Sequence, residues 1–240
     1  MGLKQEIRKI LWKAGYDISK FAPASHPLAR RKRILSYYDI DTVLDIGANA
    51  GQFARQLRED MGYEKEIVSF EPMSSVFEVL QVNAAPDRRW RALNMALGDI
   101  DEEQTINIAG NSYSSSLLEM LPSHLKSAPE SGYIDTETIK VRKLDSVFDS
   151  FCGSSKNIYM KIDTQGFEGQ VLKGAEGSLQ YIDTVQMEMS LVPLYEGEVP
   201  FREMYAIMNE KGYSLIAMET GFSDPESGQL LQVDGIFRRL

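Results

Sequence analysis

The alternation of short apolar runs with helical segments constrains the fold of this chain more than any other sequence feature. Residues 42–46, 66–70 and 90–97 have the length and composition of buried strands. The segments between them, residues 51–60 and 73–83, space their apolar residues as helices do. Strands that alternate with helices indicate a parallel sheet with helices on both faces, so the pattern predicts an α/β fold.

Beyond the third strand the alternation is interrupted and then resumes. Residues 104–109 and 136–141 read as strands, and the serine-rich segment between them, residues 110–132, predicts a loop or lid. The later elements are predicted at residues 157–162 and 184–189 (strands), 168–179 and 201–211 (helices), and 213–218 and 230–237 (a closing antiparallel pair). We therefore expect one domain over residues 41–240, into which residues 104–142 are inserted as a hairpin and lid.

The chain before this domain is expected to be a helical extension, residues 1–40, with helices at 2–14 and 28–38. Residues 1–33 carry nine lysines and arginines against two acidic residues, whereas the whole chain has a net charge of −9. An acidic body argues against nucleic acid as a partner. The basic run at residues 30–33 is either a contact for an anionic substrate or membrane surface, or a solvated helix face beside the acidic body.

Composition excludes several classes of protein. Of the 240 residues, 43% are hydrophobic and 25% are charged, which is ordinary for a globular chain. Cys152 is the single cysteine, so no internal disulfide can form, and the two histidines, His26 and His124, lie too far apart in sequence to suggest a zinc site. No apolar stretch is long enough to span a bilayer, and the N-terminus has no secretory signal. We expect a cytoplasmic protein, and the sequence leaves its oligomeric state open, a dimer included.

A glycine-rich turn follows the first strand and contains Gly47, Ala48, Asn49 and Gly51. Glycines allow positive φ angles and close approach of a ligand, and the helix that follows offers free N–H groups. Asp45 at the strand end would repel a pyrophosphate and attract an ammonium group. The turn lacks the G-x-G-x-x-G pattern of dinucleotide sites and the Gly-Lys-Ser/Thr of a P-loop.

The ends of the next two strands complete a nucleoside pocket in this interpretation. Glu71, followed by Pro72, stands where a carboxylate holds the two hydroxyls of a ribose. Asn94, Leu97, Gly98 and Asp99 come at the end of the third strand, where an adenine would lie. A carboxylate near an ammonium beside a nucleoside fits S-adenosylmethionine.

Three carboxylates are predicted to gather at the same sheet edge. Asp163 follows a strand directly, Glu168 lies in the first turn of the next helix, and Glu188 is near the end of the next strand. Each is a candidate base, acceptor-orienting group or ligand of Mg²⁺, although Glu168 would equally cap its own helix. His124, in the serine-rich segment, is an alternative base or a solvated loop histidine.

Several of these motifs together resemble the FkbM-type methyltransferases. The matching stretches are Asp-Ile-Gly-Ala-Asn-Ala-Gly (45–51), Phe-Glu-Pro (70–72), Asn-Met-Ala-Leu-Gly (94–98), Leu-Asp (144–145), Lys-Ile-Asp-Thr-Gln-Gly-Phe-Glu (161–168), Leu-Lys-Gly-Ala (172–175) and Asp-Gly-Ile-Phe (234–237). The family often has Val and Glu where this chain has Thr164 and Gln165, so one carboxylate is missing here.

The resemblance implies a class I methyltransferase fold, a Rossmann-like, mostly parallel sheet of seven strands whose final strand is antiparallel. It implies O-methylation of a hydroxyl on a sugar, glycan, glycolipid or polyketide, with S-adenosylmethionine as donor. On this basis Asp45, Gly47, Asn49 and Gly51 would hold the methionine part, Glu71 the ribose, and residues 94–99 the adenine edge. N-methylation on the same fold and a non-catalytic binding module are the alternatives.

Overall fold

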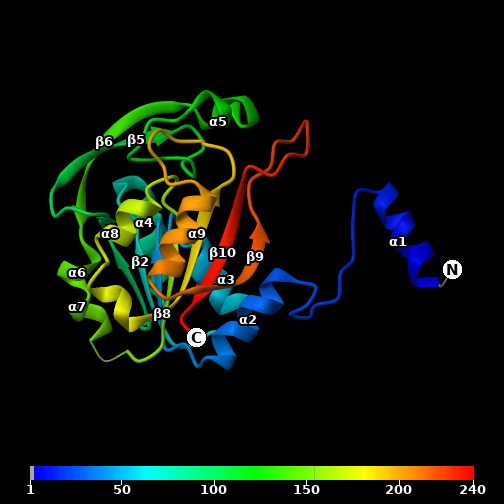
Figure 1. Ribbon diagram of the computed structural model, residues 1–240, viewed down its shortest axis with the longest axis horizontal. Coiled ribbons are helices and arrows are strands. Elements are labelled where there is room, and N and C mark those ends of the chain that lie inside the picture. Colours follow the sequence, from blue (N-terminus) through cyan, green and yellow to red (C-terminus); the bar gives the residue numbers. More distant parts are fainter. Residues whose placement is uncertain (1–2, 154) are drawn as a thin grey trace.

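The computed structural model describes residues 3–153 and 155–240, and its centre is one large sheet (Figure 1). The strands of this sheet are β1 (Thr42–Ile46), β2 (Glu66–Phe70), β3 (Trp90–Leu93), β7 (Ile158–Ile162), β8 (Ile182–Ser190), β9 (Ser214–Thr220) and β10 (Gln232–Arg238). They lie in the order β3-β2-β1-β7-β8-β10-β9. β10 is antiparallel to both of its neighbours, while the pairs formed by β1, β2, β3, β7 and β8 are parallel. The predicted α/β class, the seven strands and the antiparallel final strand are confirmed.

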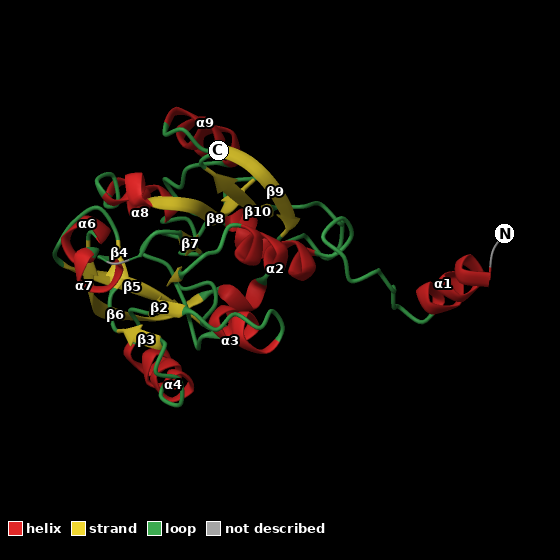
Figure 2. Cartoon of the chain, turned by 90° about the horizontal axis from the view of Figure 1, so that it is seen from below, coloured by secondary structure: helices red, strands yellow, loops and turns green. Residues whose placement is uncertain are grey.

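Helices cover both faces of this sheet, as the alternation predicts (Figure 2). One face packs on α2 (Pro27–Tyr37), α3 (Gln52–Glu59) and α4 (Ser74–Ala84). The other packs on α6 (Leu144–Val147), α7 (Asp149–Cys152), α8 (Glu168–Lys173) and α9 (Phe201–Glu210). Neighbouring residues of one strand point to opposite faces, so Val43 joins the first core and Leu44 the second. Both side chains are fully buried, which explains why the strands read as continuous apolar runs.

A second sheet contains β4 (Ala96–Leu97), β5 (Glu103–Ala109) and β6 (Tyr133–Arg142), in the order β4-β6-β5. The third strand was expected to run unbroken through residues 90–97, and this prediction is wrong: the strand ends at Leu93, and Ala96 and Leu97 belong to the second sheet. The side-chain amide of Asn94 donates to the carbonyl oxygens of Glu71 (3.0 Å) and Pro72 (2.9 Å). These bonds hold the chain at the end of β3, and the residues after it pair with β6 instead.

The serine-rich segment lies between β5 and β6 and is partly helical. It contains α5 (Pro122–Ser127) and η1, a 3-10 turn at Pro129–Ser131. Two predicted helices also differ from expectation. The helix expected at residues 168–179 ends at Lys173, before a separate 3-10 turn, η2 (Ser178–Tyr181). In α4, which residues 73–83 predicted from their apolar spacing, the apolar side chains of Val79 and Val82 are 49% and 71% exposed.

The N-terminal region divides differently from the predicted extension. α1 (Leu3–Lys13) projects away from the body in Figures 1 and 2, joined to it by an extended stretch. α2 is instead part of the body, because Ile34 and Leu35 are buried in the core shared with α3 and α4. We therefore propose that a domain boundary lies before α2 rather than at residue 40. None of the helices in the described part of the chain has the length and hydrophobicity needed to cross a bilayer.

Candidate functional site

A cavity of about 370 Å³ opens at the carboxyl ends of β1, β2, β7 and β8. The strand order reverses between β1 and β7, and ligands of open α/β sheets bind in the crevice at such a point. The volume lies in the range of small-molecule sites. The walls are formed by residues 46–49, 52, 53, 56, 70–73, 96, 97, 106, 112, 113, 115–117, 161, 163–165, 167 and 188.

The turn after β1 needs its glycines partly for packing. Gly47 and Gly51 have φ angles of +75° and +85°. A Cβ on Gly47 would overlap the main-chain oxygen of Asp163, and a Cβ on Gly51 would lie 2.6 Å from the ring of Trp90. Gly47, Ala48 and Asn49 line the cavity, while Gly51 lies behind its wall. The turn thus brings three of the predicted cofactor residues to the cavity.

Glu71 presents a fixed carboxylate at the end of β2. Its side chain is buried, and its two oxygens accept hydrogen bonds from the main-chain N–H groups of Met73 and Asn49, both at 2.9 Å. Burial raises the pKa of Glu71 to about 7, and these two N–H groups oppose the shift. Each carboxylate oxygen has two lone pairs, so one remains on each for a ligand hydroxyl. Glu71 and Pro72 both line the cavity, so a ribose there can reach the carboxylate.

Asp45 lies beneath the cavity rather than in its wall. It is fully buried on β1, and its Oδ2 accepts a hydrogen bond from Ser69 at 3.2 Å. Its Oδ1 has no hydrogen-bond partner and lies 3.8 Å from Nζ of Lys161. Burial raises the pKa of Asp45, while the Lys161 ammonium opposes the rise. The position does not match a direct contact with the methionine ammonium, which is the role predicted for Asp45.

Lys161, Asp163, Gln165 and Glu188 form a continuous polar cluster in the cavity wall. Nζ of Lys161 lies 3.0 Å from Oδ2 of Asp163. The amide nitrogen of Gln165 donates to Oδ1 of Asp163 (3.0 Å) and to Oε2 of Glu188 (2.9 Å). Oε2 of Glu188 also accepts from the side-chain amide of Gln232 at 2.8 Å. The two carboxylates predicted at neighbouring strand ends therefore meet in one site.

The two carboxylates of this cluster have opposite electrostatic surroundings. Burial disfavours ionisation of Asp163, but the Lys161 ammonium and the Gln165 amide outweigh it and hold the pKa of Asp163 below its ordinary value. Burial, reinforced by the charge of Asp163, raises the pKa of Glu188 well above its ordinary value. The surroundings thus favour the charged form of Asp163 and disfavour the charged form of Glu188, so Glu188 is the stronger base of the two.

Glu168 and His124 lie outside the cavity wall. Glu168 is buried, and its Oε1 accepts hydrogen bonds from the main-chain N–H (2.8 Å) and hydroxyl (3.1 Å) of Thr164. It therefore fixes the turn before α8 through Thr164. His124 is not solvated, since it is 3% exposed and packs against the rings of Tyr195 and Phe222. Neither residue is placed where it could contact a ligand in this cavity.

Of the four residues predicted around the adenine, the structure places one in the cavity wall and three outside it. Leu97 lines the cavity, together with Ala96, whereas Asn94, Gly98 and Asp99 do not. Asn94 is engaged with the chain after β2, and a Cβ on Gly98 would lie 2.8 Å from Val141. The break in the predicted third strand causes this division, because only part of residues 94–99 stays beside the cavity.

Several cavity residues were not predicted from the sequence. Tyr113 and Gln52 reach the cavity from opposite sides, and their side chains approach to 3.3 Å. The hydroxyl of Ser116 donates to the main-chain oxygen of Gln165 at 2.7 Å, which ties the serine-rich segment to the loop after β7. The serine-rich composition of this segment indicated that it could contact the site, but the sequence did not show which serine binds the loop after β7.

Strained backbone conformations concentrate at this cavity. Among the described non-glycine residues, four have positive φ: Asp39, Asn49, Ser112 and Gln165. All but Asp39 line the cavity. Left-handed non-glycine residues are costly and persist where the surroundings fix them, which is a property of ligand sites. The strain supports a functional role independently of the charges.

A divalent cation finds no obvious site. Within residues 3–153 and 155–240 there is no group of three His, Cys, Asp or Glu side chains arranged to hold a metal ion. The ammonium of Lys161 occupies the space between Asp45 and Asp163, where it supplies positive charge. The Mg²⁺ considered from the sequence therefore gains no support.

Comparisons with known proteins give a family and several distant structures. The family model described as Methyltransferase FkbM domain matches residues 45–215. Among solved structures, the methyltransferase domain of bacterial CtHen1 is 15% identical with a TM-score of 0.45, and the alignment covers 88% of this chain and 96% of that one. Methyltransferase FkbM from Methylobacillus flagellatus KT is 14% identical with a TM-score of 0.46, over 82% of this chain and 44% of that one.

A third structure comes from Streptococcus pneumoniae and contains S-adenosyl-L-methionine. Its description as a tRNA (m1A22) methyltransferase is a provisional one. It is 8% identical, with a TM-score of 0.47, over 88% of this chain and 72% of that one. No curated protein sequence matches this chain significantly.

Proposed function

This chain belongs to the FkbM methyltransferase family, and from that premise we propose that it transfers a methyl group from S-adenosylmethionine to a hydroxyl of a sugar, glycan or related metabolite. The family makes the chain an S-adenosylmethionine-dependent methyltransferase. The observation that supports a hydroxyl acceptor concerns the carboxylate of Glu188. Its raised pKa and its place in the cavity wall suit a general base.

The residues present fit the donor in three respects. Glu71 offers one lone pair on each oxygen to the two ribose hydroxyls. Apolar side chains of Phe70, Met73 and Leu97 line the neighbouring wall, where a flat base can pack. Gly47 and Ala48 line the cavity with main chain and a single methyl group, so the methionine part can approach them closely. When bound, S-adenosylmethionine supplies an electrophilic methyl group on a sulfonium.

Glu188 is the group that we propose takes the acceptor proton. Both of its hydrogen bonds within the described chain end on Oε2, so Oε1 is left to accept the O–H of an acceptor. In its ionised form Glu188 would take the acceptor proton on Oε1, while the donor's methyl carbon would pass from sulfur to the acceptor oxygen and the sulfonium would leave as a neutral thioether. An alcohol is a poor nucleophile at neutral pH, so this transfer contributes to the rate.

Asp163 is better suited to orient the acceptor than to take its proton. One of its oxygens is held by Lys161 and the other by Gln165, and its pKa is held low. A carboxylate with a low pKa is a weak base but a good hydrogen-bond acceptor. We propose that it binds a second hydroxyl of the acceptor, as two neighbouring hydroxyls of a sugar would require.

The test begins with labelled S-adenosylmethionine and a panel of cell glycans and small hydroxylated metabolites. Methyl ethers among the products, identified by mass spectrometry, would support the proposal, and labelled amines would instead show N-methylation. Once an acceptor is known, Glu188→Gln should retain donor binding in calorimetry and lose turnover by about 10²–10⁴-fold. Glu196→Gln, a change at an exposed position outside the cavity, is the matched control. Full turnover in Glu188→Gln would contradict the role of Glu188.

A further inference from the structure

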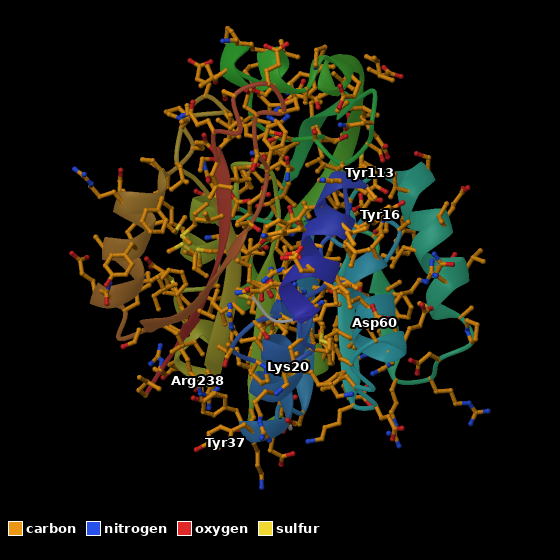
Figure 3. All side chains as sticks on the ribbon, turned by 90° about the vertical axis from the view of Figure 1, so that its right-hand side faces the viewer. Tyr16, Lys20, Tyr37, Asp60, Tyr113 and Arg238 are labelled. Atoms are coloured by element: carbon orange, nitrogen blue, oxygen red, sulfur yellow. The ribbon has the colours of Figure 1, made fainter. Side chains whose placement is uncertain are left out.

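Large apolar side chains gather on the N-terminal segment without being buried. Between residues 7 and 21, six of them are 48–70% exposed: Ile7, Ile10, Trp12, Tyr16, Ile18 and Phe21. Figure 3 looks from the side on which this segment projects and labels Tyr16 and Lys20, which follow α1. Single exposed apolar residues are normal, but a contiguous group marks a contact surface.

α1 has two different faces. Ile7, Ile10 and Leu11 are three and four residues apart and so lie on one face of the helix. On the other face, Arg8 stacks over the ring of Trp12, with 5.3 Å from its guanidinium carbon to the ring centre. Ile7 and Ile10 on the apolar face are exposed, and so are Tyr16, Ile18 and Phe21 in the stretch that follows.

The acidic charge beside this helix is neutralised locally. Arg8 and Asp17 are 2.6 Å apart, and the indole N–H of Trp12 donates to the same carboxylate at 3.0 Å. The Arg8 guanidinium holds the pKa of Asp17 well below its ordinary value, so this carboxylate stays ionised and paired. Glu6, the other acidic residue of the segment, lies 3.5 Å from the ammonium of Lys9, and Lys13 and Lys20 add two further exposed positive charges.

The basic run at residues 30–33 serves the body instead. Arg31 forms a salt bridge with Glu219 at 2.7 Å, in which the two side chains are 12% and 5% exposed. Arg30 donates to the carbonyl oxygens of Pro23 and Met218, at 3.1 and 3.3 Å. The sequence left a contact with an anionic surface and a solvated helix face as alternatives for this run, and half of the run holds α2 against the sheet.

We propose that α1 and the stretch that follows it, residues 3–21, bind the surface of an anionic lipid bilayer. The apolar face of α1 lies in the interface, and Tyr16, Ile18 and Phe21 add further contacts there, while lysines of the segment face the lipid headgroups. An amphipathic helix with basic residues on its polar side is typical of such interfacial segments, and aromatic residues favour the same depth. No membrane-spanning element is needed.

Charge complementarity selects the bilayer over a second copy of the chain. Residues 3–21 carry five lysines and arginines against two acidic residues, and an anionic leaflet attracts such basic segments. A second copy would offer its acidic body, but an apolar partner surface is also needed. On the described part of the body the large exposed apolar side chains are spread over several elements, for example Tyr37 on α2, Val82 on α4, Ile134 on β6 and Tyr205 on α9.

The binding assay uses the full chain and sedimentation with vesicles. We expect binding to phosphatidylcholine vesicles that contain about one third phosphatidylglycerol, and little binding to pure phosphatidylcholine. Basic residues attract an anionic surface within a Debye length, so raising the salt from about 0.05 M to 0.5 M should weaken the binding at least about tenfold. Equal binding to both vesicles, or none at low salt, would overturn the proposal.

Two variants separate the apolar and the basic contributions. The double change Ile7→Gln and Ile10→Gln removes the apolar face at constant charge, and Lys13→Gln with Lys20→Gln removes two charges. Each should weaken vesicle binding about tenfold or more, by loss of apolar contact or of attraction to the headgroups. The matched control combines Ile134→Gln and Lys140→Gln, which are exposed on β6, and should bind as the parent does.

The remaining outcome is self-association. Because the changed side chains are exposed, the variants should keep the melting temperature of the parent, which excludes loss of folding as a cause. Light scattering without vesicles then measures the mass of the parent and of the Ile7/Ile10 variant. A dimer that this variant abolishes, together with vesicle binding that it leaves unchanged, would assign the face to a second copy and reject the bilayer.

Discussion

The amide nitrogen of Gln165 lies 2.9 Å from Oε2 of Glu188 and donates a hydrogen bond to it. The same nitrogen donates to Asp163, and the amide oxygen of Gln165 accepts from the hydroxyl of Tyr195 at 2.8 Å. Gln165 is held at a φ of +54°, so the chain is strained where the amide reaches both acids. A neutral side chain thus allows two carboxylates with different pKa values to share one wall of the cavity.

Replacing this amide by a carboxylate should destabilise the protein in a pH-dependent way. In Gln165→Glu a third carboxylate would face Asp163 and Glu188, which raises its pKa in the folded state. Stability should therefore fall as the pH rises from the unfolded value, about 4.3, through that raised value. Gln165→Ala loses the same hydrogen bonds without adding charge, so it should cost about 1–3 kcal/mol with little further dependence on pH.

Urea denaturation of both variants at pH 5 and pH 8 measures this difference. The gap between them should widen at pH 8, because the new glutamate, which Gln165→Ala lacks, gains charge between these two pH values. A gap that is the same at both pH values would show that Gln165 acts only through its hydrogen bonds.

Glu71 should make both stability and donor binding depend on pH. Its pKa is raised by burial from an ordinary 4.5 to about 7, so the folded state holds a proton that the unfolded state releases. Stability relative to Glu71→Gln should therefore decrease as the pH rises from about 4.5 to about 7. The ribose contact needs the ionised form, so affinity for S-adenosylmethionine should increase up to about tenfold between pH 6 and pH 8. Calorimetry at these pH values tests this, and a slope that persists in Glu71→Gln would assign the effect to another group.

Gly47 should tolerate substitution far less than a glycine with the same backbone conformation in open space. In Gly47→Ala the new Cβ would overlap the main chain of Asp163, in addition to the strain of a positive φ. Gly62 also has a positive φ, +66°, but nothing lies within 4 Å of its Cβ position. We expect Gly62→Ala to cost about 1–2 kcal/mol and Gly47→Ala about 4 kcal/mol or more, as measured by chemical denaturation. Equal costs would mean that β1 and β7 can separate at this point.

The salt bridge between Arg31 and Glu219 should hold α2 on the body. Arg31→Met leaves a buried carboxylate without its partner and should lower the free energy of unfolding by about 3–5 kcal/mol. Arg33→Met, on the exposed side of the same helix, should change it by less than about 0.5 kcal/mol. If both changes are equally mild in thermal and urea unfolding, α2 belongs to the N-terminal extension, as the sequence predicted.

The strand-helix alternation was sufficient to predict the α/β class, the five strands of the parallel part and the position of the cavity. The residues of these strands and of the loops after them are constrained locally. Buried strands must be apolar on both faces, and groups that follow parallel strands meet at one edge of the sheet. Glu71, Asp163 and Glu188 could be predicted in this way, because each stands at a strand end.

Tertiary contacts decided the rest, because they join residues far apart in the chain. Whether Asn94 ends the third strand depends on carbonyl groups more than twenty residues away, and the same contact removed it from the cavity. His124 is a base or a packing residue according to which rings surround it. The sequence by itself thus determined the fold class and the acids at the strand ends. Only the folded chain decided which acid has a raised pKa and which a lowered one, since burial and the reach of Lys161 and Gln165 set these shifts.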